Sequence, residues 1–450
     1  MLKLKKTLLL VPFACACSAM TSAGELFDLY QLALGNDARY AAARAQQQAA
    51  QQLVPLARSG LLPKIALSGS YSREAVNSES PNILGRMAER EYRFTSESYS
   101  ANLIQPLYRQ ASLEEYWQAQ WQVKSADALL NRNLDDLKRR LTESYLEVQL
   151  AQARIALIEQ QKIAYAELRR QAQRSFESGY GTLTEVAESQ SRLDELLSEE
   201  VSAKAAYDNR LTELRNIIGR PTYVTKLAEV PDFVPDMHAG KSREDWIALA
   251  ELNAPLLKEQ QAKVKAAEYE VGKARAGFLP TLDLRLQYSN QKNPGYTNIN
   301  TTNDSASVLL SLSVPVFEGG ATLAQSRRAA AELLAAREAS RGVGDDLRAT
   351  IAKEFDTVTA LAVRIDALEK SVKTNELLVH ATEKSVSAGV RTNVDSLNAQ
   401  SRLFEARLRL TESRISYLLS MVNLRTAAGL VQDEELLKID ELLRSSTAKS

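Results

Sequence analysis

The apolar residues of this 450-residue chain recur with two different periods, one typical of strands and one typical of helices. Over residues 282–288, leucine or tyrosine stands at every second position and alternates with Asp283, Arg285 and Gln287. This alternation predicts a β-strand with one apolar and one polar face. Over residues 130–148, apolar side chains recur at spacings of four and three, which is the period of a coiled-coil helix.

Four segments carry the strand pattern, and they form two pairs. Each pair follows a Gly-x-Leu-Pro sequence, whose proline ends the preceding helix. The polar stretches within the pairs, 73–97 and 290–306, are expected to be loops. Strands of about ten residues suit a membrane barrel. A half-buried sheet in a soluble domain fits the same pattern equally well.

Each strand pair is followed by a stretch that predicts one very long helix. Residues 107–178 contain neither glycine nor proline, and residues 321–388 are their counterpart, which Gly342 and Gly344 are expected to interrupt. A helix of about 67 residues spans roughly 100 Å, far more than a globular core.

Shorter helices are expected to complete a rod beside the two long ones. The segments 183–218 and 393–428 return after a turn, and the segments 26–58 and 243–276 lead into the strands. One returning helix and one leading helix together match a long helix in length. We expect 183–218 to stack on 243–276, and 393–428 to stack on 26–58.

The two halves of the chain resemble each other. Residues 57–72 share eight of sixteen positions with residues 274–289, and the tetrapeptide Gln-Ser-Arg-Leu recurs at 190–193 and 400–403. A repeat of this length is a duplicated domain-sized unit rather than a solenoid. The predicted division is a leader over 1–23, structural repeats over 24–235 and 236–430, and a C-terminal segment over 431–450.

The leader has the features of a secretory signal peptide. Three lysines precede an apolar run, and small residues precede Gly24. Both cysteines, Cys15 and Cys17, lie inside this leader, so we expect a mature chain without a disulfide; lipid attachment at either is the minority interpretation.

Composition excludes several function classes. The chain has 56 basic and 56 acidic residues, and removing the leader leaves an excess of acids, which argues against a nucleic-acid partner. The only two histidines are far apart, and we find no nucleophile–base pair, phosphate loop or metal-ligand spacing. We therefore expect neither an enzyme nor a cofactor or metal site.

Four strands cannot close a barrel by themselves, and an open sheet edge cannot lie in lipid. If the strands span a membrane, the chain must share one barrel with other copies of itself.

Three segments resemble the TolC family of outer-membrane exit ducts: Leu279–Leu284 before the third strand, Pro315–Gly320 after the fourth, and Ser385–Asp395. The resemblance covers essentially the whole mature chain. It implies a mixed, mainly α-helical membrane protein: a homotrimer with a 12-stranded β-barrel in the outer membrane of a Gram-negative bacterium, continued by an α-helical barrel into the periplasm. It also implies an equatorial belt, here about 219–242 and 430–450.

The resemblance also implies partners. These are a periplasmic adaptor and an inner-membrane transporter, either ABC-type or proton-driven, besides the surrounding lipid. The cargo stays open between proteins of a type I secretion system and small molecules of an efflux pump. The alternative function is a periplasmic coiled-coil adaptor or scaffold, although an adaptor needs one hairpin between compact β domains and this chain predicts two.

Two turns form the predicted hairpin tips. Gly179 and Gly389 end the long helices, and Thr182 and Thr392 begin the returning ones. A carboxylate stands three residues after each threonine, at Glu185 and Asp395, which is the spacing of a capping box.

The resemblance gives some of these residues a second role, as adaptor-docking tips and as a periplasmic gate. Asp395 matches a carboxylate ring at the narrowest point of the tunnel, and Arg391 and Glu185 match an ion pair that holds the gate shut. The chain departs from the family pattern at Asn398, which replaces a second acidic ring, and at Val386, which replaces an aromatic latch.

The polar strand residues Asp283, Arg285 and Gln287 are expected to face the lumen, and the alternative is a solvated sheet face. Tyr71, Tyr99 and Tyr288 are expected at the membrane interface, as aromatic girdles are.

Overall fold

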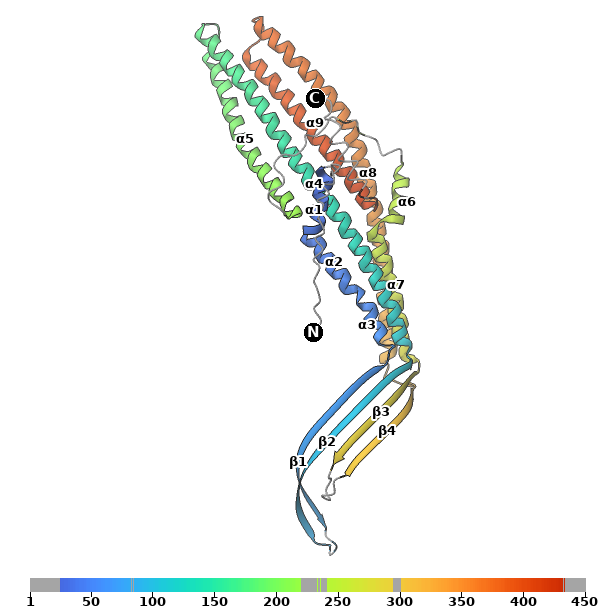
Figure 1. Cartoon of the computed structure of the whole chain (residues 1–450). Coiled ribbons are helices and arrows are strands. Elements are labelled where there is room, and N and C mark those ends of the chain that lie inside the picture. Colours follow the sequence, from blue (N-terminus) through green and yellow to red (C-terminus); the bar gives the residue numbers. More distant parts are fainter. Residues whose placement is uncertain are drawn as a thin grey trace, which may run out of the picture.

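Long helices and a four-stranded sheet form an elongated molecule, with the sheet at one end and two helical hairpin tips at the other (Figure 1). The predicted leader and most of the predicted belt lie outside the residues that the structure describes. The computed structural model describes residues 25–81, 83, 85–219, 233, 235, 241–293, 301–431 and 433.

The helices and strands occur in the predicted order. The first half contains α1 (Glu25–Asn36), α2 (Ala38–Gln51), α3 (Leu53–Ser59), β1 (Lys64–Pro81), β2 (Met87–Tyr108), α4 (Gln110–Glu177) and α5 (Leu183–Ile218). The second half contains α6 (Arg243–Asn253), α7 (Pro255–Arg275), a short 3-10 turn (Ala276–Phe278), β3 (Thr281–Asn293), β4 (Thr301–Ser313), α8 (Ala321–Ser387) and α9 (Asn393–Ala427).

The leading segments are broken into shorter helices. Asp37 separates α1 from α2 and caps α2 by accepting a hydrogen bond from the Tyr40 amide at 2.7 Å. Pro255 begins α7, because proline is tolerated in the first turn of a helix. The expected interruption at Gly342 and Gly344 is wrong: α8 continues through both, since each glycine costs only about 1 kcal/mol in a helix of 67 residues.

The short helices stack end to end in an order that differs from the prediction. A Cβ on Gly219, at the end of α5, would lie 2.5 Å from the Cβ of Asn36, so α5 abuts the junction between α1 and α2. A Cβ on Gly429, after α9, would lie 2.7 Å from the Asn253 carbonyl oxygen, so α9 abuts the start of α7. Each returning helix therefore stacks on the leading helices of its own half. Length alone could not distinguish the two pairings.

Polar contacts along α4 follow the same order. The leading helices contact the part of α4 nearest the sheet, and α5 contacts the part nearest the tip. In sequence order along α4 these contacts are Gln47–Asp127, Asp37–Arg140, Arg210–Glu147, Glu199–Arg154 and Glu200–Lys162.

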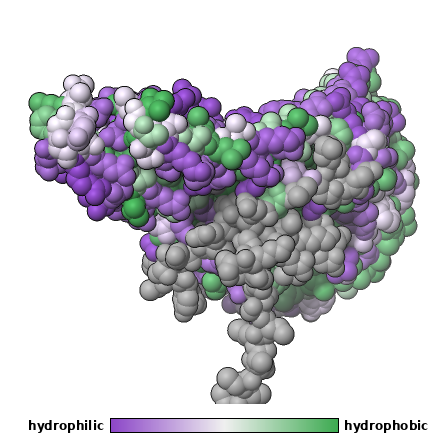
Figure 2. All heavy atoms as spheres, turned by 90° about the horizontal axis from the view of Figure 1, so that it is seen from above, coloured by the Kyte–Doolittle hydropathy of each residue, from purple (hydrophilic) through white to green (hydrophobic). Residues whose placement is uncertain are grey.

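The main apolar core lies where the stacked helices meet. Leu137, Leu141 and Tyr145 of α4 are fully buried there against residues of α1, α5, α8 and α9. Elsewhere the rod is thin, and its helical end shows a mostly hydrophilic surface with apolar residues in small groups (Figure 2). Of the helices in the described part of the chain, none is long and apolar enough to cross a membrane.

The sheet is antiparallel, with the order β1-β2-β3-β4, so β1 and β4 are its two edges. The predicted loop over 73–97 is wrong for most of its length, because β1 and β2 remain paired as far as Pro81 and Met87. Its serine-rich and charged composition concealed this strand pairing. In the second loop, strand pairing also continues beyond the prediction, to Asn293 and Thr301, and residues 294–300 lie outside the described residues.

Candidate channel wall and hairpin tips

One face of the sheet is apolar across all four strands. Residues that lie opposite each other in the register share a face, and this rule aligns the apolar positions of every strand. Several are largely exposed, including Leu67 at 81% and Leu310 at 61%. A continuous exposed apolar face is what membrane strands present to lipid. Its members are Ile65, Leu67, Tyr71, Tyr99, Leu103, Leu284, Leu286, Tyr288, Val308, Leu310 and Leu312.

The opposite face is polar and rich in serine. The hydroxyl pairs Ser68–Ser100, Ser70–Ser98 and Ser289–Ser305 lie at 2.7, 2.8 and 2.7 Å, respectively. Arg285 and Gln287 lie exposed on this same face, where the alternation predicted them. The sheet therefore has one apolar and one polar face, which is the pattern of membrane β-strands.

Asp283 shares the polar face, but its side chain does not stand open in a lumen. Arg109, between β2 and α4, donates to it through Nε to Oδ1 at 2.9 Å and through Nη2 to Oδ2 at 2.6 Å. Asp283 is only 5% exposed. This bidentate pair joins the start of the long helix to the third strand. No local pattern predicts this ion pair, because Arg109 and Asp283 are far apart in the chain.

The two hairpin tips use the same backbone turn. Gly179 and Gly389 have φ of 76° and 73°, the left-handed region that favours glycine. The carbonyl of Ser175 accepts from the amides of residues 180 and 181, and the carbonyl of Ser385 accepts from those of residues 390 and 391. The predicted tip glycines therefore end their helices as a Schellman-type turn does.

Thr182 and Thr392 cap the returning helices, as predicted. The Thr392 hydroxyl accepts from the Asp395 amide at 3.3 Å, while Asp395 Oδ2 accepts from the Thr392 amide at 3.0 Å. This capping box holds the pKa of Asp395 below its usual range, mainly through the backbone hydrogen bond from Thr392. Thr182 accepts only from the Glu185 amide, at 3.3 Å.

The structure of one chain does not bring Arg391 to Glu185. Arg391 donates to the Thr382 hydroxyl at 3.4 Å, and neither charged side chain has an ion-pair partner within the described ranges. The tips also carry exposed apolar side chains, Tyr180 at 94% and Val390 at 78%. An ion pair across hairpins would therefore need a neighbouring copy or another state of the hairpins.

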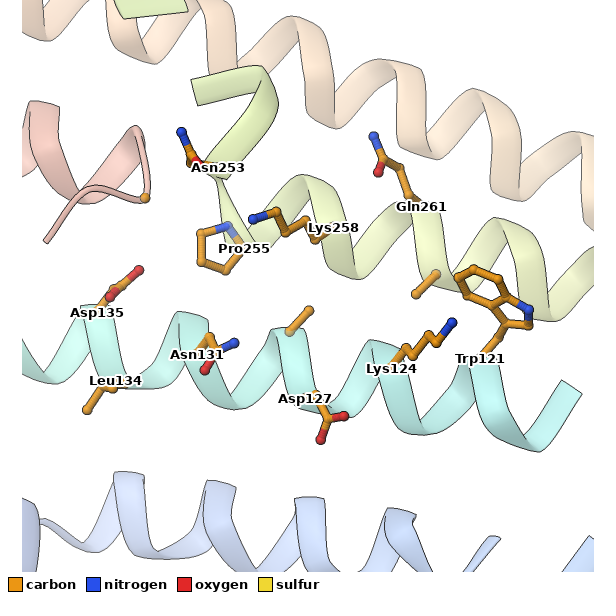
Figure 3. Close-up of a pocket in the computed structure, with 13 residues that line it drawn as sticks. Trp121, Lys124, Asp127, Asn131, Leu134, Asp135, Asn253, Pro255, Lys258 and Gln261 are labelled. Atoms are coloured by element: carbon orange, nitrogen blue, oxygen red, sulfur yellow. The ribbon is translucent and has the colours of Figure 1, made fainter. Parts of the chain in front are cut away.

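A cleft of about 560 Å³, lined by both polar and apolar residues, lies between α4 and the segment from α6 to α7 (Figure 3). Lys124, on α4, lies over the ring of Trp121 at 3.8 Å, and Lys258, on α7, lines the opposite side of the cleft. Asp135 lies at one end, where burial raises the pKa of its carboxyl to about 6. The cleft mixes both charge signs, and among the residues that the structure places there is no group of three or more possible metal ligands.

A second buried charge, on α4, binds the segment that follows α9. Lys138, only 4% exposed, donates to the Val431 carbonyl at 2.8 Å and pairs with Asp433 at 2.8 Å. Its Nζ lies 5.5 Å from the ring of Tyr30, whose pKa is raised by burial and by Asp433. The apolar period of α4 did not predict that Lys138 is buried, because this residue stands beside the apolar seam position Leu137 and not on it.

Comparison with known proteins gives this geometry a context. Residues 29–220 and 246–430 match the model of a family described as outer membrane efflux protein. The chain is 30% identical to the proteases secretion protein PrtF of Dickeya chrysanthemi, covering 98% of this chain and 96% of that protein. It is 32% identical to the alkaline protease secretion protein AprF of Pseudomonas aeruginosa, covering 91% and 85%, respectively.

Solved structures have the same fold. The outer membrane channel CmeC of Campylobacter jejuni superposes with a TM-score of 0.78 at 18% identity, covering 93% of this chain and 89% of that one. The family match and the exposed apolar face of the sheet favour a channel over a periplasmic adaptor. The chain thus belongs to the outer membrane efflux protein family and is an export channel of the Gram-negative outer membrane.

Proposed function

We propose that three copies of this chain form one protein-export duct, with four strands from each copy closing a single 12-stranded barrel. The observation that carries this proposal is the open sheet: β1 and β4 are both edge strands, and one face is apolar throughout. Lipid cannot satisfy the amides of an exposed edge, so each β1 must pair with the β4 of a neighbouring copy.

The helices of the three copies continue the barrel as a tunnel. Exposed apolar residues on α5 and α8 support this arrangement, because they would be covered by a neighbouring subunit; Val201 is 70% exposed and Leu377 is 71% exposed. The recurring order of elements and the two-part family match support an origin by duplication of one half.

The proposed cargo is protein, exported by a type I system. Support comes from PrtF and AprF, whose names both describe protease secretion. A periplasmic adaptor would dock at the tips around Gly179, Thr182, Gly389 and Thr392, and would connect the duct to an inner-membrane ABC transporter. Arg391, Glu185 and Asp395 of neighbouring hairpins would form the gate at that end.

The first test is assembly and conduction. The purified protein is expected to have the mass of a trimer in detergent and to insert into planar bilayers as a cation-preferring channel, because carboxylates converge at the tips. A protein that stays monomeric and conducts no ions contradicts the duct.

Cargo is tested separately, in cells that lack their own protease-secretion outer-membrane channel but keep its transporter and adaptor. Expression of this chain is expected to restore extracellular protease. If expression restores only resistance to small toxic molecules, the result is consistent with the proposed duct but contradicts protein as its cargo.

A further inference from the structure

The polar face of the sheet carries its charged residues at one end only. Within the four-stranded part of the sheet, the cross-strand register places three charged residues on this face: Lys64 of β1, and Asp283 and Arg285 of β3. The other positions of the face are mainly serine, asparagine and glutamine. Both strands begin where the sheet joins the helices (Figure 1), so the charged positions lie at that inner end.

Lys64 and Arg285 lie in one row across the strands. Lys64 pairs with Ile104 in the register, and Ile104 pairs with Arg285, so all three side chains share a face. Both basic side chains are exposed. Because side chains alternate along a strand, the neighbouring residues Ile65 and Leu286 lie on the apolar face. The two cations are therefore on the face turned away from lipid, and they are not anchors for lipid headgroups.

The one carboxylate near this row does not neutralise the two cations. Both oxygens of Asp283 are bound by Arg109, at 2.9 and 2.6 Å. Arg285 lies 4.0 Å from the same carboxylate, and its side chain is 51% exposed. Three basic residues, Lys64, Arg109 and Arg285, stand against one acid, so each copy has a net charge of +2 at this end of the polar face.

A neighbouring copy brings no carboxylate to this row in the proposed barrel. Each β1 would pair with the β4 of the next copy, and the only acidic residue within β4 (Thr301–Ser313) is Asp304. Asp304 pairs with Asn290 in the register and therefore lies on the same face as Tyr288, which is the apolar one. The charge of +2 in one copy thus becomes +6 in three.

We propose that Lys64 and Arg285 of three copies form a basic ring at the inner end of the barrel, and that this ring binds acidic segments of the passing cargo. This inference rests on the proposed trimeric duct. Twelve strands about 4.8 Å apart and tilted about 40° enclose a radius of roughly 12 Å. The Debye length at physiological salt is about 8 Å, so the field of side chains that project inward reaches the axis. Rings of arginine and lysine are the usual means by which a pore attracts anions.

The ring has the opposite charge to the carboxylates of the proposed gate at the hairpin tips. The narrow tips govern which ions the closed duct conducts, whereas the ring acts on groups that have already entered the barrel. Water and salt screen charges at an exposed ring, so it holds each acidic segment weakly and the cargo can move on.

The test measures the electrostatic potential beside the ring with a reporter thiol. Both natural cysteines lie within residues 1–23, and Gln287→Cys places a thiol on the polar face of β3, about 7 Å along the strand from Arg285. The purified trimer is treated with two methanethiosulfonates of similar size, one bearing a sulfonate and the other a trimethylammonium group. The ratio of their rates is divided by the same ratio for a free thiol in solution. This quotient reports the local potential, because the reactivity of the thiol itself cancels.

The anionic reagent is expected to be favoured beside the ring. Arg285→Gln is expected to lower the rate ratio about fivefold at low salt, since one unit charge at about 7 Å acts on the two reagents with opposite signs. Lys64→Gln removes a charge farther from the reporter and is expected to lower the ratio about twofold. Arg285→Lys keeps the charge and is expected to keep most of the ratio. At about 1 M salt the effect of Arg285→Gln is expected to disappear, because the Debye length falls to about 3 Å.

Lys292→Gln is the matched control. Lys292 lies on the same strand as Arg285 but on the opposite face, so its loss is expected to leave the ratio unchanged. Equal ratios in the Arg285→Gln and Lys292→Gln trimers contradict the basic ring. If Arg285→Gln prevents assembly, Lys64→Gln is judged against the same control. A protein that is monomeric contradicts the proposed duct instead.

Binding of an acidic chain is measured with the same reporter. An oligoglutamate peptide is expected to slow the reaction of the thiol with neutral N-ethylmaleimide, and an oligolysine peptide of equal length is expected not to slow it. The double variant Lys64→Gln with Arg285→Gln is expected to lose this protection. Protection that persists in the double variant, or that oligolysine gives equally well, contradicts the binding of acidic segments by the ring.

Discussion

Single residues at the junction of the sheet and the helical rod make contacts that their strand or helix pattern does not predict. Asp283 reads as one polar position among several in an alternating strand, yet Arg109 binds it through two hydrogen bonds and buries it. Arg285 and Gln287, on the same face, remain exposed. The alternation predicted the face of all three residues, but only contact with a residue far away in the sequence separated the buried one from the exposed ones.

Arg109→Ala is expected to destabilise the protein by about 3 kcal/mol, because it leaves a buried carboxylate without its partner. The measurement is the temperature at which the detergent-solubilised oligomer dissociates. Arg285→Ala is the matched control: Arg285 lies 4.0 Å from the same carboxylate and has a side chain 51% exposed, so its loss is expected to cost less than about 1 kcal/mol. Equal losses for the two variants contradict a special role for Arg109.

At the scale of the elements, local signals located the helices closely. The absence of glycine and proline predicted α4, and the tip sequences predicted where α5 and α9 begin. Proline before the strands marked the end of each leading helix. The order of end-to-end stacking was not predictable in this way, because 36-residue α5 and 35-residue α9 are nearly interchangeable in length.

Replacing glycines by alanine tests the end-to-end stacking of the helices. Gly429 has a φ of 67° and no room for a Cβ beside Asn253, so Gly429→Ala is expected to destabilise the protein by about 1–3 kcal/mol. Gly342 lies inside α8 with nothing within 4 Å of a Cβ, so Gly342→Ala is expected to stabilise it by about 0.5–1 kcal/mol. Thermal dissociation of both variants gives the comparison. A stabilising Gly429→Ala would contradict close contact between α9 and the start of α7.

At the scale of the whole molecule, the four strands of one chain form an open sheet and not a closed barrel. Its sheet has two unpaired edges, and the proposed gate residues Arg391 and Glu185 do not meet within it. The capping box already accounts for the Asp395 carboxylate in the single chain. A gate role for these side chains therefore depends on neighbouring copies.

Arg391→Glu is expected to raise the single-channel conductance, because Glu185 and Asp395 of the assembled tips would then repel the new carboxylate. Conductance in planar bilayers is the measurement, and Arg402→Glu, farther along α9 from the tip, is the control that should leave conductance unchanged. If the Arg391→Glu protein is trimeric and its conductance is unchanged, the gate role is contradicted, and capping of α9 is the role that remains for Asp395.

The sequence by itself determined the features that depend on neighbouring residues: two long helices, two capped turns, and strands with one apolar face. Their signals are periodicity, proline, glycine and capping side chains, all of which act within a few residues. Tertiary structure alone decided which helices stack, that Arg109 buries Asp283, and that β1 and β2 stay paired where a loop was expected. These depend on contacts between distant segments, whose geometry no local pattern encodes.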